Sequence, residues 1–246
     1  MKTRRLMGQV CLVTGAGRGL GRAVALALAD EGAAVLLHCN RSHQGARLLR
    51  DLIRGKGGVA HVRQADLTCE SSRRRLVRET LRLLGRIDIL VNSAGIFAQS
   101  DLASLTSQKL DHLFAVNLTA PILLSRDCSG IMISQGSGRI INISSLGAFK
   151  SWPKYLGYCA SKAALVSATR TMARALAPHI LVNSVAPGFI DLPTDLRPSA
   201  KKRLIAAIPA QRTGSYQNIV DAVLYFCTAE YVTGQILAVD GGASLV

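Results

Sequence analysis

The sequence predicts a doubly wound α/β fold, in which a parallel sheet of about seven strands is covered by helices on both faces. Two observations support this fold class. Short apolar segments alternate with helix-like segments along the whole chain of 246 residues. The apolar segments are continuously aliphatic, which is typical of strands buried on both faces rather than on one. Because no linker, repeat or low-complexity stretch interrupts this alternation, we expect a single domain spanning residues 1–246.

The predicted strands share a short aliphatic run bounded by glycine or polar residues. They span residues 10–13, 34–37, 59–62, 87–91, 139–143, 180–185 and 236–239. The predicted helices share apolar residues at helical spacing, and the first of them ends before Gly32. They span residues 22–31, 44–54, 71–84, 109–125, 158–176 and 218–227. The segment 189–212 is variable in pattern, so no regular element is predicted there.

Composition excludes several classes of protein. With 49% hydrophobic residues the chain is too apolar to be disordered. Its longest apolar runs fall short of the roughly 18 residues that a membrane-spanning helix needs. The basic start is followed by a short apolar run that contains Gly8 and Gln9 and leads into a glycine-rich turn, so we interpret it as a strand rather than a signal peptide. We therefore expect a soluble, cytoplasmic protein with no membrane partner.

Neither the cysteines nor the histidines indicate a metal site. The six cysteines are scattered without a CxxC pair, and the five histidines show no HExxH spacing. Free cysteines in apolar runs behave as small hydrophobic residues, and a reducing compartment suits them. We expect neither a disulfide framework nor a bound metal.

The formal net charge is +15, and its densest cluster is Arg73–Arg75 with Arg78 and Arg82. Because these arginines lie at helical spacing beside leucine and valine, we interpret them as the solvated face of an amphipathic helix. A nucleic-acid surface is the alternative, but no aromatic residue or recognition motif accompanies the cluster. We expect no nucleic-acid partner, whereas an anionic cofactor or an acidic carrier protein fits the charge.

A glycine-rich turn follows the first predicted strand and opens the first predicted helix. Glycine there allows a tight turn and lets a pyrophosphate approach backbone N–H groups at the helix N-terminus, where the helix dipole favours an anion. We predict that this turn binds a dinucleotide through Gly15, Gly17, Arg18, Gly19, Leu20 and Gly21.

The end of the second predicted strand reads His38-Cys39-Asn40-Arg41-Ser42 and lacks the carboxylate that usually binds the ribose of NAD. Arg41, together with Arg18 in the glycine-rich turn, could instead pair with a 2′-phosphate through its guanidinium. The alternative is that both are ordinary surface arginines of an arginine-rich chain. We predict a preference for NADP(H), with NAD(H) remaining possible.

Tyr158 and Lys162 lie at positions i and i+4 of a predicted helix and therefore share one face. By itself this pair is weak evidence for function, but it belongs to an ordered series of motifs. These are the glycine pattern Thr14–Gly21, Asp66-Leu67, Asn92-Ser93-Ala94-Gly95, Asn117, Ser145, Tyr158 with Lys162, Pro187-Gly188 and Asp240-Gly241-Gly242. In this order they resemble the short-chain dehydrogenase/reductase family over essentially the whole chain.

The resemblance implies a Rossmann-type fold and a catalytic tetrad of Asn117, Ser145, Tyr158 and Lys162. Tyr158 would protonate a carbonyl oxygen as hydride arrives, and Ser145 would hydrogen-bond that oxygen. Lys162 would lower the pKa of Tyr158 and hold the nicotinamide ribose, and Asn117 would position a water molecule. The further cofactor-binding residues implied are Asp66, Leu67, Asn92, Ala94, Gly95, Pro187, Gly188 and Ile190, with Tyr158 and Lys162.

The overall pattern is most similar to 3-oxoacyl-carrier-protein reductases, which implies a 3-oxoacyl thioester substrate and acyl carrier protein as a partner. Two stretches that are often basic in those enzymes read Ser134–Gly138 and Ala177-Pro178-His179 here. A pteridine reductase, or a reductase of other small ketones or quinones, is the alternative, although Gly19 and Ser145 differ from well-known pteridine reductases. A non-catalytic NADP(H) sensor is a remote alternative, because such relatives typically lose the tyrosine or the lysine.

The resemblance also implies a substrate lid near residues 190–212. Within it, Leu192 stands where the family usually has threonine, and Thr194 lies nearby. Family members are usually tetramers, so we expect a homotetramer or a dimer formed through the helix that carries Tyr158. Its small residues would permit close helix packing between subunits, although they could also pack inside one subunit. They are Ala163, Ala164, Ala168 and Ala173.

Overall fold

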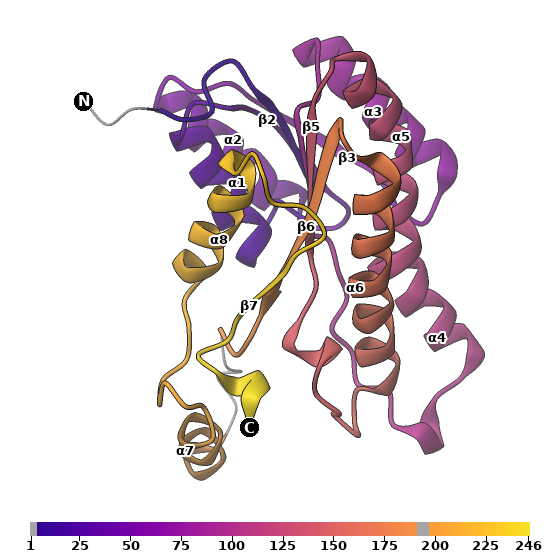
Figure 1. The fold of residues 1–246 in the computed structure, drawn as a ribbon, viewed down its shortest axis with the longest axis vertical. Coiled ribbons are helices and arrows are strands. Elements are labelled where there is room, and N and C mark those ends of the chain that lie inside the picture. Colours follow the sequence, from indigo (N-terminus) through magenta and orange to yellow (C-terminus); the bar gives the residue numbers. More distant parts are fainter. Residues whose placement is uncertain (1–3, 191–196) are drawn as a thin grey trace.

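Seven parallel strands form a sheet in the order β3-β2-β1-β4-β5-β6-β7 (Figure 1). The computed structural model describes residues 4–190 and 197–246. The strands are β1 (Val10–Val13), β2 (Ala34–Cys39), β3 (Ala60–Gln64), β4 (Ile89–Asn92), β5 (Gly138–Ile143), β6 (Ile180–Pro187) and β7 (Ile236–Val239). This arrangement confirms the predicted doubly wound fold class.

Helices cover both faces of the sheet. They are α1 (Gly19–Asp30), α2 (His43–Gly55), α3 (Glu70–Leu84), α4 (Ser107–Phe114), α5 (Ala120–Ser134), α6 (Leu156–Leu176), α7 (Pro198–Ala206) and α8 (Tyr216–Thr228). In Figure 1, α1, α2 and α8 lie on one side of the sheet, and α3, α4, α5 and α6 lie on the other. No helix in the described part of the chain is long and apolar enough to cross a membrane.

Two elements differ from the sequence-based prediction. The helix predicted over 109–125 is α4 and α5 joined by a π-helical turn (Ala115–Thr119), and α5 continues to Ser134. The segment predicted without a regular element contains α7, which begins with Pro198 and buries none of its residues. Because only Ala200, Leu204 and Ile205 of α7 are partly buried, the helix shows little of the apolar periodicity from which a helix is predicted. The π turn between α4 and α5 is likewise not visible in the spacing of apolar residues along the sequence.

The core consists of two apolar layers, one on each face of the sheet. Successive residues of a strand point to opposite faces, so Cys11 and Val13 pack toward α1 and α8, whereas Leu12 packs toward α3 and α5. Strands buried on both faces explain why the predicted strands are continuously aliphatic. Ala173 is buried in the second layer, so it packs inside the subunit and is not exposed for a contact between subunits.

Arg73 is an exception to the predicted solvated arginine face. Its side chain is buried, and one guanidinium nitrogen donates a hydrogen bond to the carbonyl oxygen of Leu67, 2.5 Å away. The other arginines of the cluster are exposed, as predicted. Arg73 lies in the first turn of α3, where its side chain can reach back to the loop that precedes the helix. A pattern of charges along the sequence does not report such a contact.

A buried polar network joins β4, β5 and α6 behind the carboxyl ends of the strands. The side-chain amide of Asn92 donates to Oδ1 of Asn142, 2.9 Å away, and the Asn142 amide donates to the Thr169 hydroxyl, also 2.9 Å away. All three residues are buried. Buried polar groups that lose their partner are costly, so this network fixes the two central strands relative to α6.

We expect Asn142→Ala to lower the free energy of unfolding by about 2 kcal/mol, because it leaves the buried Asn92 amide and Thr169 hydroxyl without their shared partner. Denaturant unfolding followed by circular dichroism measures the change. Asn40→Ala, at an exposed asparagine, is the matched control and should change the stability by less than about 0.5 kcal/mol. Equal effects of the two substitutions would contradict the role of the network.

Candidate active site

The sequence-predicted site residues gather at the carboxyl edge of the sheet, where the chain leaves β1, β4, β5 and β6. The order of the sheet reverses between β1 and β4, so the connections from these two strands leave on opposite faces. The glycine-rich turn links β1 to α1, and its last three residues form the first turn of α1. The N-cap residue, Arg18, makes no capping hydrogen bond through its side chain, and no acidic residue lies in the first turn. This helix end thus presents N–H groups suited to an anion.

The glycines of the turn serve two purposes. A side chain at Gly17 would overlap the carbonyl oxygen of Ser42, and one at Gly45 would overlap the carbonyl oxygen of Gly17, so the turn is in direct contact with the start of α2. Gly19 has a φ of +53°, which favours glycine. The nearest atom to a side chain there is the Tyr216 hydroxyl at 3.5 Å, so the space before α1 is open. The turn therefore fits a pyrophosphate.

Arg18 and Arg41 are both exposed at this edge, as a role in binding a phosphate requires. Asp66 follows β3, and its Oδ1 accepts hydrogen bonds from the N–H and hydroxyl of Thr68 at 2.9 and 2.8 Å. These hydrogen bonds lower the pKa of Asp66, and the charges of His112 and Arg41 lower it further. Arg41 and Asp66 thus lie near each other at the adenosine end of the predicted cofactor site.

The segment after β4 is held against the glycine-rich turn by Thr14, which begins the glycine pattern but to which the sequence analysis assigns no role. Its hydroxyl oxygen accepts hydrogen bonds from the N–H groups of Ser93 and Ala94, both at 3.0 Å. A side chain at Gly95 would lie 3.3 Å from Asn117 Oδ1 and 3.5 Å from Lys162 Nζ. The structure thus brings the segment 93–95 beside two members of the predicted tetrad. The side chain of Asn92 belongs to the buried network and also reaches α5, where its amide donates to the Ser125 hydroxyl at 3.2 Å.

Tyr158 and Lys162 lie on α6, with Ser145 opposite them just after β5. The Lys162 ammonium donates to the carbonyl oxygen of Ile143 at 2.7 Å and lies 6.0 Å from the centre of the Tyr158 ring. Ser145 Oγ accepts a hydrogen bond from the N–H of Gly147 at 3.0 Å. Tyr158, Lys162 and Ser145 therefore form one group, as the sequence predicts.

Asn117 occupies the π-helical turn between α4 and α5 and is fully buried. Its Oδ1 accepts from the N–H of Ile96 at 2.8 Å, and its amide donates to the Ile96 carbonyl at 3.0 Å and to the Ser161 hydroxyl at 3.1 Å. Ser161 in turn donates to the carbonyl oxygen of Tyr158 at 2.7 Å. Asn117 thus connects the segment after β4 to the turn of α6 that carries Tyr158. Such π turns are frequent at functional sites.

The electrostatics of Tyr158 differ from the sequence-based expectation that Lys162 lowers its pKa. Burial raises the pKa of Tyr158, and the hydrogen bond with Ser145 acts in the opposite direction. Burial also lowers the pKa of Lys162 to about 8. Each shift favours the neutral form, because a low-dielectric environment disfavours charge on either group. Burial, rather than the attraction between the two groups, is the dominant effect here.

An aromatic cluster, consisting of Phe97, Trp152, Tyr155 and Phe189, lies beside Tyr158. Phe97 stacks on Tyr155 with ring centres 4.4 Å apart and meets Tyr158 edge-on at 4.8 Å. The Trp152 ring is parallel to that of Tyr158 at 6.4 Å and contacts Phe189 at 5.9 Å. The chain has only one Trp, five Tyr and five Phe, so five of its eleven aromatic residues lie in or beside this cluster. Sequence reasoning missed it because Phe97 and Phe189 are distant along the chain.

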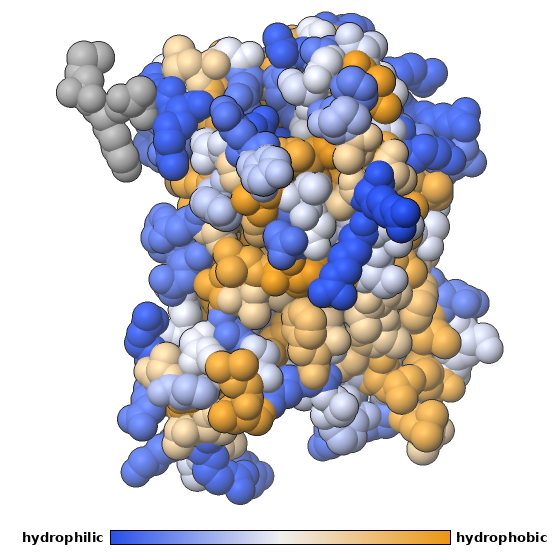
Figure 2. All heavy atoms as spheres, viewed as in Figure 1, coloured by the Kyte–Doolittle hydropathy of each residue, from blue (hydrophilic) through white to orange (hydrophobic). Residues whose placement is uncertain are grey.

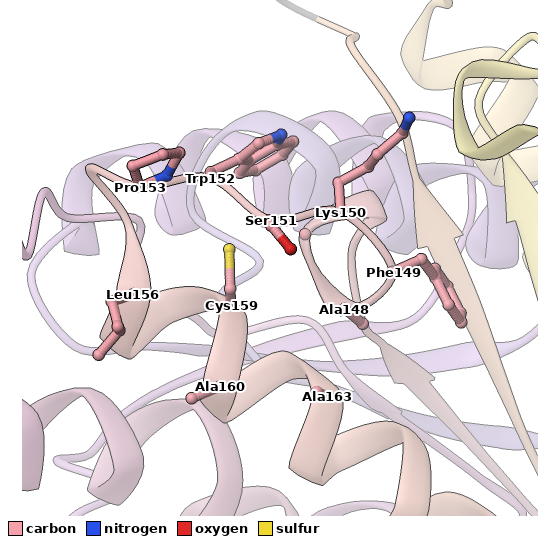
Figure 3. A pocket seen from close by; sticks show the side chains of 11 residues that line it. Ala148, Phe149, Lys150, Ser151, Trp152, Pro153, Leu156, Cys159, Ala160 and Ala163 are labelled. Atoms are coloured by element: carbon pink, nitrogen blue, oxygen red, sulfur yellow. The ribbon is translucent and has the colours of Figure 1, made fainter. Parts of the chain in front are cut away.

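A cavity of about 370 Å³ lies between the N-terminal turns of α6 and the segment that follows Ser145 (Figure 3). The Cys159 thiol points into it from α6, and Trp152, whose ring also faces Tyr158, is one of the residues that line it. In Figure 2, apolar residues gather over the same lower part of α6. Leu156, Ala160 and Ala163 lie in this part of α6, and all three are exposed.

The remaining predicted residues follow β6. Gly188 donates its N–H to the carbonyl oxygen of Val239 at 3.0 Å, which ties it to β7. Ile190 packs against the first apolar layer. Leu192, Thr194 and the rest of the segment 191–196 lie outside the described residues, so only part of the predicted lid is described. In the described ranges, no group of three or more His, Cys, Asp or Glu side chains could hold a metal ion.

Comparison with known proteins places these features in a family. The family model described as "Enoyl-(Acyl carrier protein) reductase" matches residues 15–244. The 3-oxoacyl-(acyl-carrier-protein) reductase FabG of Aquifex aeolicus is 37% identical over 244 residues, which is 97% of this chain and 98% of the relative.

Two solved structures are also similar over nearly their whole length. One is FolM alternative dihydrofolate reductase 1 of Brucella canis complexed with NADP, at 36% identity and a TM-score of 0.92, covering 100% of this chain and 97% of that one. The other is a gluconate 5-dehydrogenase of Burkholderia cenocepacia with NADP and tartrate, at 30% identity and a TM-score of 0.92, covering 99% and 98%. The chain therefore belongs to the short-chain dehydrogenase/reductase family of NAD(P)-dependent oxidoreductases, as its ordered motifs predict.

Proposed function

We propose that the protein is an NADPH-dependent reductase that converts a carbonyl group to an alcohol, with a 3-oxoacyl thioester as its substrate. The observation that carries this proposal is the group formed by Tyr158, Ser145, Lys162 and Asn117 beside Gly95 at the carboxyl edge of the sheet. The likeness to 3-oxoacyl-carrier-protein reductases over almost the entire chain supports the thioester as substrate.

The residues of the carboxyl edge fit a nicotinamide dinucleotide, which supplies the hydride when bound. The uncapped end of α1 would hold the pyrophosphate, and Asp66 would contact the adenine. Arg41 and Arg18 would pair with the 2′-phosphate, which favours NADPH over NADH. The solved relatives that contain NADP support this preference. The other residues proposed to line the site are Gly15, Gly17, Gly19, Leu20, Gly21, Leu67, Asn92, Ala94, Gly95, Pro187, Gly188 and Ile190.

Tyr158 acts as the proton donor. Because burial raises its pKa, the hydroxyl stays protonated at neutral pH and has a proton to give to the substrate oxygen. Ser145 donates a hydrogen bond to the same oxygen and stabilises its developing negative charge. Lys162, protonated below a pH of about 8, stabilises the phenolate that the proton transfer leaves on Tyr158. Asn117 holds the backbone of Ile96 and, through Ser161, the turn of α6 that carries Tyr158.

A carrier protein that delivers the thioester would approach a basic surface. The exposed side of α7 carries Lys201, Lys202 and Arg203, and α7 lies beyond the carboxyl edge of the sheet in Figure 1. Acidic side chains of a carrier would be attracted to this helix. It offers a basic contact in place of the stretches 134–138 and 177–179, which are not basic in this chain.

A second candidate substrate is a planar ring compound, such as a pteridine or a quinone. The specific observation in its favour is the aromatic cluster, because Phe97 is 59% exposed and so has ring surface free for stacking beside Tyr158. The likeness to the Brucella canis FolM structure also favours it.

Two features of the whole chain belong to the same proposal. Residues 1–246 act as one cofactor-binding domain, with the segment 190–212 as a lid over the substrate. Subunits associate into a tetramer or a dimer through α6, where Leu156, Ala160 and Ala163 are exposed. Small side chains there allow two helices to approach closely.

Replacing Tyr158 by phenylalanine removes the proton donor but keeps the ring. We expect kcat for NADPH-dependent reduction of acetoacetyl thioesters to fall about a thousandfold while NADPH binding is retained. The loss of NADPH absorbance measures turnover, and NADPH fluorescence measures binding. Tyr225→Phe, at an exposed tyrosine of α8, is the control and should keep kcat within about twofold. If wild-type protein binds NADPH but reduces neither thioesters nor ring ketones, the proposed activity is wrong and a sensor role gains support.

The pH dependence of reduction should follow Lys162. Both Tyr158 and Lys162 must be protonated, and the lower of the two pKa values is that of Lys162, at about 8. We therefore expect kcat/KM to be flat below this pH and to fall as the pH rises through it. A pH–rate profile between about 6 and 10 tests this. A rate that rises over the same range would contradict the roles given to the two residues.

Phe97→Leu separates the two candidate substrates. Because leucine keeps apolar volume but offers no ring for stacking, we expect kcat/KM for dihydrobiopterin or a quinone to fall about tenfold and that for acetoacetyl thioesters to change by less than about threefold. Phe149→Leu, at an exposed phenylalanine outside the aromatic cluster, is the control. Equal effects on both substrates, or no turnover of ring compounds by the wild type, would eliminate the second candidate.

A further inference from the structure

His38 is a buried histidine that the proposed mechanism does not use. It is the last residue but one of β2 and is 1% exposed. The strand residues on either side of it, Leu37 and Cys39, are buried and apolar, so an apolar residue would suit the same buried position. Burying a polar ring is costly unless both of its nitrogens have partners.

Both ring nitrogens have a partner, and the partners belong to two different segments. Nδ1 accepts a hydrogen bond from the N–H of Gly15 at 3.3 Å, and Nε2 lies 3.0 Å from the carbonyl oxygen of Ala65. A backbone N–H can only donate and a carbonyl can only accept, so the ring must be neutral with its proton on Nε2. The main chain adds a third link, because the carbonyl oxygen of His38 accepts from the N–H of Ala16 at 2.8 Å.

Each partner is adjacent to a residue assigned to the cofactor. Gly15 begins the turn that would hold the pyrophosphate, and Ala65 immediately precedes Asp66, which would contact the adenine. These two segments follow β1 and β3, which are not neighbours in the sheet, since β2 lies between them. The imidazole therefore spans the width of β2 and fixes the distance between the two halves of the adenosine-binding surface.

The surroundings keep the ring in the required neutral form. Burial lowers the pKa of His38, and this effect outweighs the hydrogen bond to Ala65 and the negative charge of Asp66, which both raise it.

We propose that His38 is a positioning residue for the cofactor, whose imidazole holds the pyrophosphate turn and the adenine-contacting loop in register so that the adenosine half of NADPH binds tightly. This inference rests on the proposed cofactor site. It assigns to His38 no contact with the reacting atoms, so the substitution acts on cofactor affinity and leaves the chemical step unchanged.

Three substitutions at His38 separate the two ring contacts. In His38→Asn, Oδ1 can replace Nδ1 as the acceptor for Gly15, and in His38→Gln, the amide can replace Nε2 as the donor to Ala65. His38→Leu loses both contacts and fills the buried space. His61→Leu is the matched control, because His61 is a half-buried histidine of the neighbouring strand β3 and lies outside the proposed site.

The readouts are the dissociation constants of NADPH and of 2′,5′-ADP, which represents the adenosine half alone, with kcat at saturating NADPH and the thermal midpoint. We expect His38→Leu to weaken both ligands about tenfold, the loss of two modest hydrogen bonds, while kcat stays within about twofold. His38→Asn and His38→Gln should each recover part of the affinity, and His61→Leu should leave it unchanged.

Unchanged affinity for 2′,5′-ADP in His38→Asn, His38→Gln and His38→Leu, with only a lower thermal midpoint, would show that His38 is merely structural and would overturn the inference. If His38→Leu does not fold, the two amide variants decide the outcome, since each retains one contact. The wild type distinguishes this inference from the proposed function. Failure of the wild type to bind NADPH refutes both, whereas normal binding by the wild type and by all three variants refutes the role of His38 alone.

Discussion

The reversal of strand order between β1 and β4 is the constraint on which the rest of the structure depends. From β1 the chain passes through α1 to β2 on one face, and from β4 it passes through α4 and α5 to β5 on the other (Figure 1). The two connections diverge, so the carboxyl edge between them stays open. Parallel strands bring all their carboxyl ends to that edge. Residues that are distant along the chain, such as Thr14, Gly95 and Ser145, therefore meet there.

Burial sets the chemistry at this edge more than the pairing of charges does. The same low-dielectric environment raises the pKa of Tyr158 and lowers that of Lys162, so both groups are biased toward their neutral forms. A tyrosine that keeps its proton is a competent acid only if the negative charge it leaves behind is compensated at once. In the proposed mechanism this is the role of the Lys162 ammonium, which lies 6.0 Å from the centre of the ring. Polar side chains with complete hydrogen bonds, such as Asn117, hold this geometry without adding charge.

The sequence predicts the parts of this protein that depend on local pattern. Aliphatic runs locate all seven strands, and the glycine spacing and the Tyr158–Lys162 pair point to the edge where the candidate site residues gather. Features that depend on tertiary contacts are not visible in it. The burial of Arg73, the π turn at Asn117 and the two contacts of His38 each require knowing which segment lies opposite. The helix α7 is not predicted for a different reason: none of its residues is fully buried, so its apolar pattern is weak.

The contact between the glycine-rich turn and the start of α2 has a consequence for engineering coenzyme preference. Gly17 packs against Ser42, and Gly45 packs against the carbonyl oxygen of Gly17, so neither glycine can carry a side chain without moving the other segment. Arg41 lies one residue before Ser42. The segment proposed to distinguish the two coenzymes and the turn proposed to hold their common pyrophosphate are therefore in direct backbone contact. A graft of residues 40–45 from an NAD-dependent relative must therefore keep this backbone path, and a graft that alters the path requires that the glycine-rich turn be exchanged with it.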